Sequence, residues 1–391
     1  MNTAIALVLG FACVLVLVEC ALFARNVSRL PLLLGAQTAG PAAWPRVSVI
    51  IAARDEIGSA GAALATRLTD DYPNLEIVFV DDRSTDGTGD AVREAGAGDA
   101  RLTVIRVDEL PAGWLGKVHA LDTGMRTATG EWLLFSDADV SIERGALRKA
   151  VAYALGEKLD MIALVPEFRM GSPLVDAVWA DFMRALALIV DPRAVRDPRR
   201  RTVIGSGSFN LVRREALERT PGFEHLRLET GDDVALAQMV KQAGGSVAMV
   251  NGRGCASVPM YASIGELMRG VEKNGSSLAH RPFALVMLAF AALLAIEYSP
   301  IAATLAGAMY GPDWLLALGG VSLAATTAVF CAALWVNTRT WAAGLLWPIG
   351  IALMVFALAR ATYLTHRRGG VVWRDTFHSL EELEAGRRVT L

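Results

Sequence analysis

Long apolar runs lie at the two ends of the chain, and shorter apolar stretches alternate with polar ones between them. Residues 3–24 contain a single charged side chain, Glu19. Three further apolar runs occupy 282–309, 314–336 and 340–365. About 20 consecutive apolar residues are enough for a helix to cross a bilayer. The pattern therefore predicts an N-terminal transmembrane anchor at 1–25 and a C-terminal membrane segment at 282–365.

Charges beside these runs indicate the orientation. Arg25 and Arg29 follow the first run, which lacks the basic start and cleavage site of a signal peptide, so we expect an uncleaved anchor with the next domain in the cytoplasm. Three full C-terminal crossings would put residues 366–391 outside, whereas the basic cluster at 366–368 favours the inside. The conflict disappears if 282–299 lies in the membrane or re-enters it without crossing. We predict a multi-pass inner-membrane protein with two or three C-terminal spans and a basic amphipathic tail at 366–391, preferably cytoplasmic.

The middle of the chain, residues 45–275, alternates short buried-type stretches with amphipathic ones. Stretches rich in β-branched residues predict strands at 46–53, 75–80, 101–107, 131–135 and 160–165. Helical stretches lie at 58–69, 87–95 and 116–129. Strands and helices that alternate in this way predict an α/β domain with a doubly wound, mostly parallel sheet. Ligands bind such sheets at the carboxyl ends of the strands.

Composition narrows the class of protein. The hydrophobic fraction of 53% is high for a soluble enzyme, in agreement with the predicted membrane segments. A net charge of −2 gives no field that attracts nucleic acid, so we expect no nucleic-acid partner. The four cysteines and five histidines show no zinc-ligand spacing.

Acidic clusters follow three of the predicted strands. They are Asp55-Glu56, Asp81-Asp82, and the pair Asp137 and Asp139. Because parallel strands end at one edge of a sheet, we expect these carboxylates to converge, and a bound cation would relieve their mutual repulsion. Such oxygen ligands suit Mg²⁺ or Mn²⁺ with a phosphate substrate. The alternative for Asp139 is an N-cap on a helix that begins near Ile142.

Four stretches resemble the ordered motifs of membrane-bound family 2 glycosyltransferases. They read VSVIIAARDE, VDDRSTDGT, GKVHALDTGMRTATGEWLLFSDADV and GDDVALAQMVKQAG, all between residues 45 and 275. The resemblance implies a Rossmann-like domain of the GT-A type that transfers a sugar with inversion from a nucleotide diphosphate sugar, here a UDP-sugar. The chain is most similar to ceramide glucosyltransferases and to hopanoid- and carotenoid-associated glycosyltransferases. That branch implies a non-processive reaction on a lipid or membrane-associated acceptor.

The resemblance also assigns residues to the nucleotide-sugar donor. The main chain near Ala53 and the pair Asp55-Glu56 would flank the uracil and ribose, although the family's Pro and Asn are replaced in this strand. Asp82 would recognise the base, with Asp81 the weaker candidate. Lys117 would lie near the diphosphate, and the alternative for it is an ordinary surface lysine at a helix start.

The metal ligands and the base follow from the same motifs. Asp139 would ligate the metal, and Asp137 would lie near the ribose or the metal. Asp232-Asp233 opens an amphipathic helix, where acids also favour the helix dipole without any catalytic role. The family has a Glu-Asp pair whose second acid takes the proton of the acceptor hydroxyl. Asp233 is therefore the expected base, and Asp232 the other catalytic candidate because it replaces the family's Glu.

Two basic segments complete the list. Processive synthases of the family carry Gln-x-x-Arg-Trp, whereas residues 266–270 read ELMRG, so the Trp that would stack on a growing sugar chain is missing. Arg269 and Lys273 share a helical face and would meet the diphosphate, or else face solvent or lipid headgroups. Residues 191–201 contain five arginines, which suits anionic lipid headgroups or simply a solvated loop.

Two other functions use the same sheet. A nucleotidyltransferase would activate a sugar or lipid phosphate, but the loop after the first strand, AARDE, offers only Arg54 and no glycine-rich phosphate cradle. A nucleotide-binding membrane scaffold or transporter would leave Asp232-Asp233 without a role. We therefore favour the glycosyltransferase.

Overall fold

A computed structural model of the chain describes residues 2–36, 40–272, 278, 281–338, 340–373 and 376–388. The chain forms two compact units. The helical unit comprises Met1–Ser28, Arg169–Ile189 and Met260–Glu381, and the α/β unit comprises Arg29–Phe168, Val190–Pro259 and Glu382–Leu391.

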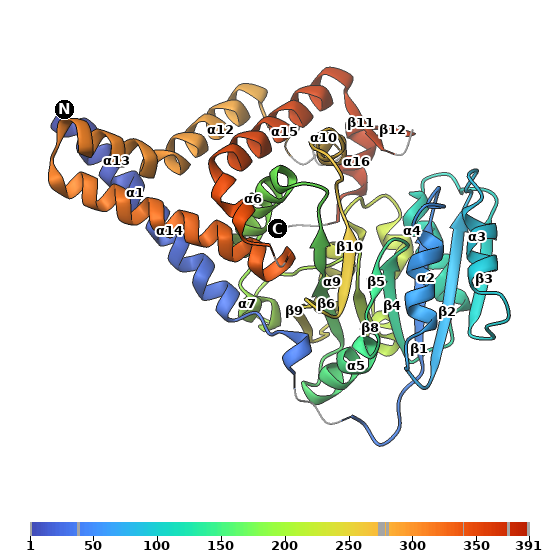
Figure 1. Ribbon diagram of the computed structural model, residues 1–391. Coiled ribbons are helices and arrows are strands. Elements are labelled where there is room, and N and C mark those ends of the chain that lie inside the picture. The colour runs from blue at the N-terminus through green and yellow to red at the C-terminus, as the bar shows by residue number, and fades with distance from the viewer. Residues whose placement is uncertain are drawn as a thin grey trace. The chain divides into compact units, whose positions relative to one another are not determined.

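The α/β unit is built on a seven-stranded sheet of order β3-β2-β1-β4-β8-β6-β9 (Figure 1). Its strands are β1 (Val47–Ala53), β2 (Leu75–Asp82), β3 (Leu102–Val107), β4 (Trp132–Asp137), β6 (Met161–Val165), β8 (Asn210–Arg213) and β9 (Val247–Asn251). All neighbouring pairs are parallel except those of β8, which runs antiparallel to β4 and β6. The predicted α/β sheet, doubly wound and mostly parallel, is confirmed.

Helices follow the strands. They are α2 (Ala60–Leu68), α3 (Thr88–Ala95), α4 (Gly116–Thr127), α5 (Ala146–Gly156), α7 (Pro192–Arg196), α8 (Arg214–Glu218) and α9 (Asp232–Gln242). Of these, α2, α3 and α4 lie at the predicted positions. The buried β-branched residues of β1 and β2 form the surface on which α4 packs. Gly124 allows the close approach, because a Cβ atom there would lie 2.6 Å from Cγ2 of Ile50. A second, three-stranded sheet contains β5 (Ser141–Ile142), β10 (Ala256–Pro259) and β7 (Glu167–Arg169).

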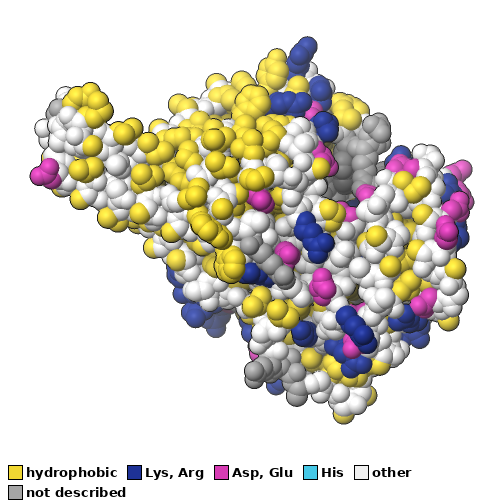
Figure 2. All heavy atoms as spheres, viewed as in Figure 1, with side chains coloured by type: hydrophobic (Ala, Val, Ile, Leu, Met, Phe, Trp, Pro, Cys, Tyr) yellow, Lys and Arg dark blue, Asp and Glu magenta, His cyan; other side chains and the backbone are white. Residues whose placement is uncertain are grey.

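The helical unit contains most of the apolar sequence. Its elements are α1 (Thr3–Ser28), α6 (Pro173–Ile189), α10 (Ile264–Glu272), α12 (Phe283–Glu297), α13 (Ser299–Tyr310), α14 (Asp313–Thr338), α15 (Trp347–Arg368), the hairpin β11 (Gly370–Trp373) with β12 (Thr376–Ser379), and α16 (Leu380–Gly386), which continues into the α/β unit. Three helices within the described residues, α1, α14 and 342–368, are long and apolar enough to cross a membrane. The pair α12 and α13 also qualifies, with a 49° bend between them. Hydrophobic side chains cover much of the visible surface of these helices (Figure 2).

The observed boundaries differ from the predicted domain at 45–275. Residues 169–189 and 260–275 fall in the range of the helical unit. The physical reason is the apolar face of α6, where Val175 and Val178 pack with Met354 and Ala357 of α15.

Charged side chains inside the apolar helices pair with one another. The Arg184 guanidinium of α6 forms ion pairs with Asp181, with Glu19 of α1 and with Glu297 of α12. Glu297 is 1% exposed and lies at the break before α13. A buried charge is tolerated only when it is paired, so this cluster fixes where α1, α6 and α12 meet.

Candidate active site

The carboxyl ends of three strands bring the predicted acidic clusters together. The strand register pairs Ala53 with Asp81 of β2 and pairs Ala52 with Asp137 of β4. Asp55 and Asp139 follow β1 and β4 directly. The convergence expected from parallel strands is therefore present in the structure.

The loops after β1 and β2 are joined by hydrogen bonds. The Asp55 N–H donates to Oγ of Ser84 (3.0 Å), and the Thr85 N–H donates to Oδ1 of Asp55 (2.8 Å). The Glu56 N–H donates to Oγ1 of Thr88 (2.8 Å). These bonds hold Asp55 at a left-handed φ of 54°. The first two motifs thus form one continuous wall of the site.

Asp81 and Asp82 differ in their surroundings. Asp81 is fully buried, and its carboxylate accepts hydrogen bonds from Arg106 (2.9 Å) and from the Ser84 N–H (3.1 Å). Asp82 pairs with Arg83 (2.8 Å). A Cβ atom at Gly116 would lie 2.2 Å from Oδ2 of Asp82, so the start of α4 lies against this carboxylate. Asp81 is held as a structural group, whereas Asp82 faces the start of α4.

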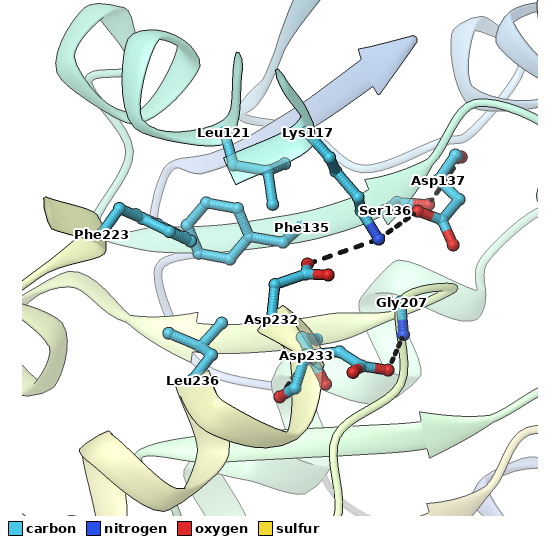
Figure 3. Close-up of a pocket in the computed structure, with 11 residues that line it drawn as sticks. Lys117, Leu121, Phe135, Ser136, Asp137, Gly207, Phe223, Asp232, Asp233 and Leu236 are labelled. Carbon is cyan, nitrogen blue, oxygen red and sulfur yellow. Dashed lines mark hydrogen bonds and ion pairs between the residues drawn. The ribbon is translucent and has the colours of Figure 1, made fainter. Parts of the chain in front are cut away.

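Lys117 lies between two of the predicted motifs. Its Nζ is 2.9 Å from Oδ1 of Asp137 and 3.4 Å from Oδ2 of Asp232 (Figure 3). Burial lowers the pKa of Lys117 and the carboxylates of Asp137, Asp232 and Asp233 raise it, with a net upward shift. Burial, opposed by Lys117, raises the pKa of Asp232. The lysine is therefore a fixed cation of the site rather than a surface residue.

Asp233 is oriented by main-chain groups. Its Oδ2 accepts a hydrogen bond from the Gly207 N–H (2.9 Å), and Oδ1 accepts one from the Val234 N–H (2.8 Å). The loop that contains Gly207 approaches closely because Gly205 has no side chain: a Cβ atom there would lie 1.9 Å from the Asp233 carbonyl oxygen. This glycine loop thus contacts Asp233 directly.

These side chains line one pocket. Figure 3 shows Lys117, Asp137, Asp232 and Asp233 around it, with apolar side chains on the other side. The apolar lining residues are Leu121, Phe135, Phe223 and Leu236. An apolar wall beside fixed charges strengthens the electrostatic interactions within the pocket.

Two residues of the site carry no signal in the sequence. Arg67 of α2 is 2% exposed, and its guanidinium donates to the carbonyls of Val140 (2.7 Å) and Asp137 (2.9 Å) and to Oγ of Ser136 (2.8 Å). Asn210 of β8 donates to the Asp233 carbonyl (3.3 Å). Both contacts join segments far apart in the chain, and a search for local motifs misses them for that reason.

Asp139 lies in the turn after β4, between Asp137 and Val140, whose carbonyls accept hydrogen bonds from Arg67. No helix begins near Ile142, because Ser141–Ile142 is strand β5 and α5 starts at Ala146, so the alternative of an N-cap there is wrong. Burial, together with the nearby carboxylates of Asp137 and Glu56, raises the pKa of Asp139 to about 6. A carboxylate destabilised by burial and by like charges is one that a cation would stabilise.

The carboxylates of Asp137 and Asp139 suit a hard divalent cation, because carboxylate oxygens are the ligands that Mg²⁺ and Mn²⁺ prefer. Within the described residues no three such side chains are gathered closely enough to form a complete metal cage. A cation bound here would therefore take its remaining ligands from a phosphate substrate or water, as Mg²⁺ usually does.

Of the two basic residues predicted near the diphosphate, the structure describes Arg269, an exposed residue of α10 in the helical unit. Lys273 lies outside the described residues.

Comparison with known proteins identifies the family of the chain. The profile of glycosyltransferase-like family 2 matches residues 45–269, and the chain belongs to this family. It is 29% identical over 126 residues to the glycosyltransferase AglE of Haloferax volcanii, a match that covers 32% of this chain and 40% of AglE. It is 29% identical over 122 residues to the 4,4'-diaponeurosporenoate glycosyltransferase of Staphylococcus haemolyticus, covering 31% of this chain and 32% of that enzyme. The match thus spans less than half the length of either relative.

The fold has a solved counterpart. The mannosyltransferase PcManGT of Pyrobaculum calidifontis, solved with GDP-Man and Mn²⁺, superposes with a TM-score of 0.53 and 23% identity. The superposition covers 93% of this chain and 98% of that one. The α/β unit is of the GT-A type, as the sequence motifs predicted.

Proposed function

We propose that the protein transfers a sugar, with inversion, from a nucleotide diphosphate sugar to a hydroxyl group of a lipid or membrane-associated acceptor. The observation that carries the proposal is the position of Lys117, whose ammonium joins Asp137 to Asp232 beside Asp233. One pocket then contains Asp137 as a candidate metal ligand, Lys117 as a cation for the diphosphate and Asp233 as a candidate base.

The donor is assigned to the edge of the sheet. The loops of Asp55 and Glu56 and the Asp82 carboxylate would contact the base and ribose, and Lys117 would contact the diphosphate. Asp137 and Asp139 would hold Mg²⁺ or Mn²⁺, which when bound offsets the charge that develops on the leaving nucleotide. That PcManGT was solved with GDP-Man and Mn²⁺ supports a nucleotide-sugar donor and a divalent metal.

Asp233 is the proposed base. The acceptor oxygen bonds to the anomeric carbon, the bond from that carbon to the diphosphate breaks, and the hydroxyl proton passes to the Asp233 carboxylate. The main-chain N–H groups of Gly207 and Val234 orient this carboxylate without neutralising it. Asp232 is more deeply buried and is paired with Lys117, so it is the less available of the two.

A single transfer fits the site better than polymer synthesis. At Gly270, where processive relatives would have Trp, a Cβ atom would lie 2.3 Å from the Tyr261 ring. A tryptophan there requires displacement of Tyr261. The carotenoid substrate in the name of the staphylococcal relative supports a lipid acceptor.

Packing within the helical unit gives a membrane topology. Helices α1 and α14 run in the same direction: a Cβ atom at Gly10 would lie 2.8 Å from Trp314, the Ser322 hydroxyl donates to the Cys13 carbonyl, and Phe23 packs with Val329. If α1 crosses the membrane toward the α/β unit, α14 crosses the same way. The chain must then reach the far side through the bent pair α12–α13.

The same reasoning gives the position of α15, the remaining apolar helix. The chain leaves α14 on the side of the α/β unit, and residues 382–388 belong to that unit. Helix α15 therefore begins and ends on one side and does not cross, although its length would allow it. This topology gives two C-terminal crossings and a tail on the catalytic side, which we propose is the cytoplasm. It differs from the earlier expectation that 282–299 does not belong to a crossing segment.

Calorimetry tests the proposed reaction most directly. We expect UDP or GDP to bind the full-length protein with Mn²⁺ and to bind weakly without it, and we expect Asp139→Ala to remove the metal-dependent part. Asp90→Ala serves as the control, because that side chain is 89% exposed on α3. Absence of binding by both nucleotides with Mn²⁺ and with Mg²⁺, or an unchanged metal dependence in Asp139→Ala, would refute the proposal.

A further inference from the structure

The segment 193–201, here called the arginine loop, presents positive charge on the α/β unit. It contains Arg193, Arg196, Arg199, Arg200 and Arg201, all of which are exposed. Arg196 pairs with Glu157 (2.8 Å). The structure shows no ion pair between described residues for the other four side chains, so their guanidinium groups are available to an external anion.

The acidic residues beside the arginines, Asp191 and Asp197, accept hydrogen bonds from main-chain N–H groups. Asp191 accepts a hydrogen bond from the Arg193 N–H (2.9 Å) and caps α7, and Asp197 accepts one from the Arg199 N–H (2.9 Å). Asp191 also pairs with Arg29. These carboxylates shape the loop, and among the described residues they form no ion pair with the other four arginines.

The loop has a fixed form because it closes around a lysine. The Lys241 ammonium of α9 donates hydrogen bonds to the carbonyls of Ala194 (3.0 Å), Val195 (2.6 Å) and Thr202 (2.8 Å). Three carbonyl acceptors on one ammonium hold both ends of the loop together. The same ammonium adds a positive charge beneath the arginines.

Chain connectivity places the arginine loop beside a membrane exit. Arg29 is the first residue after α1, and its guanidinium lies 2.8 Å from Asp191. The next residues are fixed to the α/β unit, because the Asn251 N–H donates to the Pro31 carbonyl (2.8 Å). They expose two apolar side chains, Leu32 (45%) and Leu34 (47%). Exposed leucines next to arginines are typical of a surface that lies at a membrane interface.

We propose that the arginine loop, with Arg29, Leu32 and Leu34, binds the headgroups of anionic phospholipids. The inference rests on the proposed membrane placement of α1, and it adds a lipid selectivity that the transfer reaction does not require. Each arginine near an anionic surface strengthens binding about fivefold. The surface would therefore hold the α/β unit against the bilayer through charge as well as through the α1 anchor.

The test measures lipid selectivity of the full-length protein in a neutral detergent. Short-chain phosphatidylglycerol and the matching phosphatidylcholine are titrated separately, and bound lipid is counted by native mass spectrometry. The wild type is compared with the triple variant R199Q/R200Q/R201Q. The control is R93Q/R126Q/R219Q. It removes three arginines of the same unit that lie outside the arginine loop, each of which pairs with an acidic residue three or four positions earlier in the chain.

We expect the wild type and the control to bind phosphatidylglycerol at least about tenfold more tightly than phosphatidylcholine. The triple variant should lose this preference, and about 0.5 M ammonium acetate should weaken it in the wild type and the control. An equal preference in the triple variant and the wild type would overturn the proposal. So would tighter binding of a short RNA that phosphatidylglycerol fails to displace. Nucleotide binding in the same samples reports on the proposed transfer reaction separately.

Discussion

The main-chain N–H of Arg388 donates a hydrogen bond of 2.5 Å to Oε2 of Glu229, 159 residues earlier in the chain. The other oxygen of Glu229 accepts a hydrogen bond from the Gly231 N–H (3.0 Å), immediately before Asp232. One buried carboxylate thus joins the C-terminal tail to the loop that precedes Asp232 and Asp233. The tail is held further by Gln238 of α9, whose amide donates to the Arg388 carbonyl (3.1 Å).

Glu229→Ala should therefore slow transfer while leaving nucleotide binding nearly intact. The variant removes the acceptor for two N–H groups near the acid pair, and leaving such groups unsatisfied costs about 1–3 kcal/mol. We expect kcat to fall and the nucleotide Kd to stay within about twofold. Steady-state kinetics and calorimetry measure the two quantities.

The control for this change is Glu218→Ala, an exposed glutamate at the end of α8. Glu229→Gln should recover part of the lost rate, since its amide oxygen still accepts one of the two hydrogen bonds. Equal losses of kcat and nucleotide affinity in Glu229→Ala would indicate general destabilisation rather than positioning of the acid pair.

Asp233→Asn should abolish transfer and preserve donor binding. The amide keeps the shape of the side chain and an oxygen for the Gly207 N–H, but it accepts no proton from the acceptor hydroxyl. Loss of a general base costs about a hundredfold or more in rate. Product formation and nucleotide calorimetry, with Asp90→Asn as the exposed control, measure both effects. Full activity of Asp233→Asn combined with an inactive Asp232→Asn would transfer the role of base to Asp232.

Metal-supported nucleotide binding should weaken as the pH falls through 6. Burial and the neighbouring carboxylates raise the pKa of Asp139 to about 6, and a proton on this group competes with the metal. Affinity should fall by up to about tenfold per pH unit below that value. Calorimetry with Mn²⁺ across this range, repeated at saturating Mn²⁺, separates competition by protons from loss of the fold.

Without metal, the effect of Asp139 on stability has the opposite sign. A carboxyl whose folded pKa exceeds its unfolded pKa stabilises the fold below the unfolded value, and this contribution is lost as the pH rises through 6. Asp139→Asn should remove the dependence and stabilise the metal-free protein at neutral pH by about 3 kcal/mol. Thermal unfolding curves of both proteins test this. A less stable Asp139→Asn at neutral pH would contradict the assignment of unfavourable charge.

The proposed topology places the two ends of α14 on opposite sides of the membrane. Tyr310→Cys and Trp341→Cys change exposed residues before and after this helix. In sealed vesicles, a membrane-impermeant maleimide should reach position 310 from the side opposite the α/β unit, and position 341 only from the same side. The protein with no added cysteine is the control for its four native thiols. Labelling of position 341 from the opposite side would show that α15 crosses.

Sequence patterns predicted the part of the fold that depends on local order along the chain. Strands β1, β2 and β4 are continuous buried runs, and the acids that follow them had to converge because the strands are parallel. The antiparallel strand β8 was not assigned, since its four residues form a run too short to show a period. The membership of α6 in the helical unit was also missed, because it depends on contacts with α15.

The candidate site shows the same division. Its acids and Lys117 were found by motif, and the structure brings Lys117 to Asp137 and Asp232. Arg67, Asn210 and Glu229 were missed because their partners lie 23 to 159 residues away. No spacing rule connects such residues, and only the folded chain shows that they meet.

The ion pair between Lys117 and Asp137 means that the ammonium of the pocket is already engaged in the protein alone. A nucleotide diphosphate arriving alone would add negative charge where the ammonium is already engaged by two carboxylates. A divalent cation arriving alone would compete with that ammonium for Asp137. With both present, Asp137 would be available to hold the cation, and the Lys117 ammonium would be available to the phosphates. Nucleotide and metal should therefore bind cooperatively, so that each binds more tightly when the other is present.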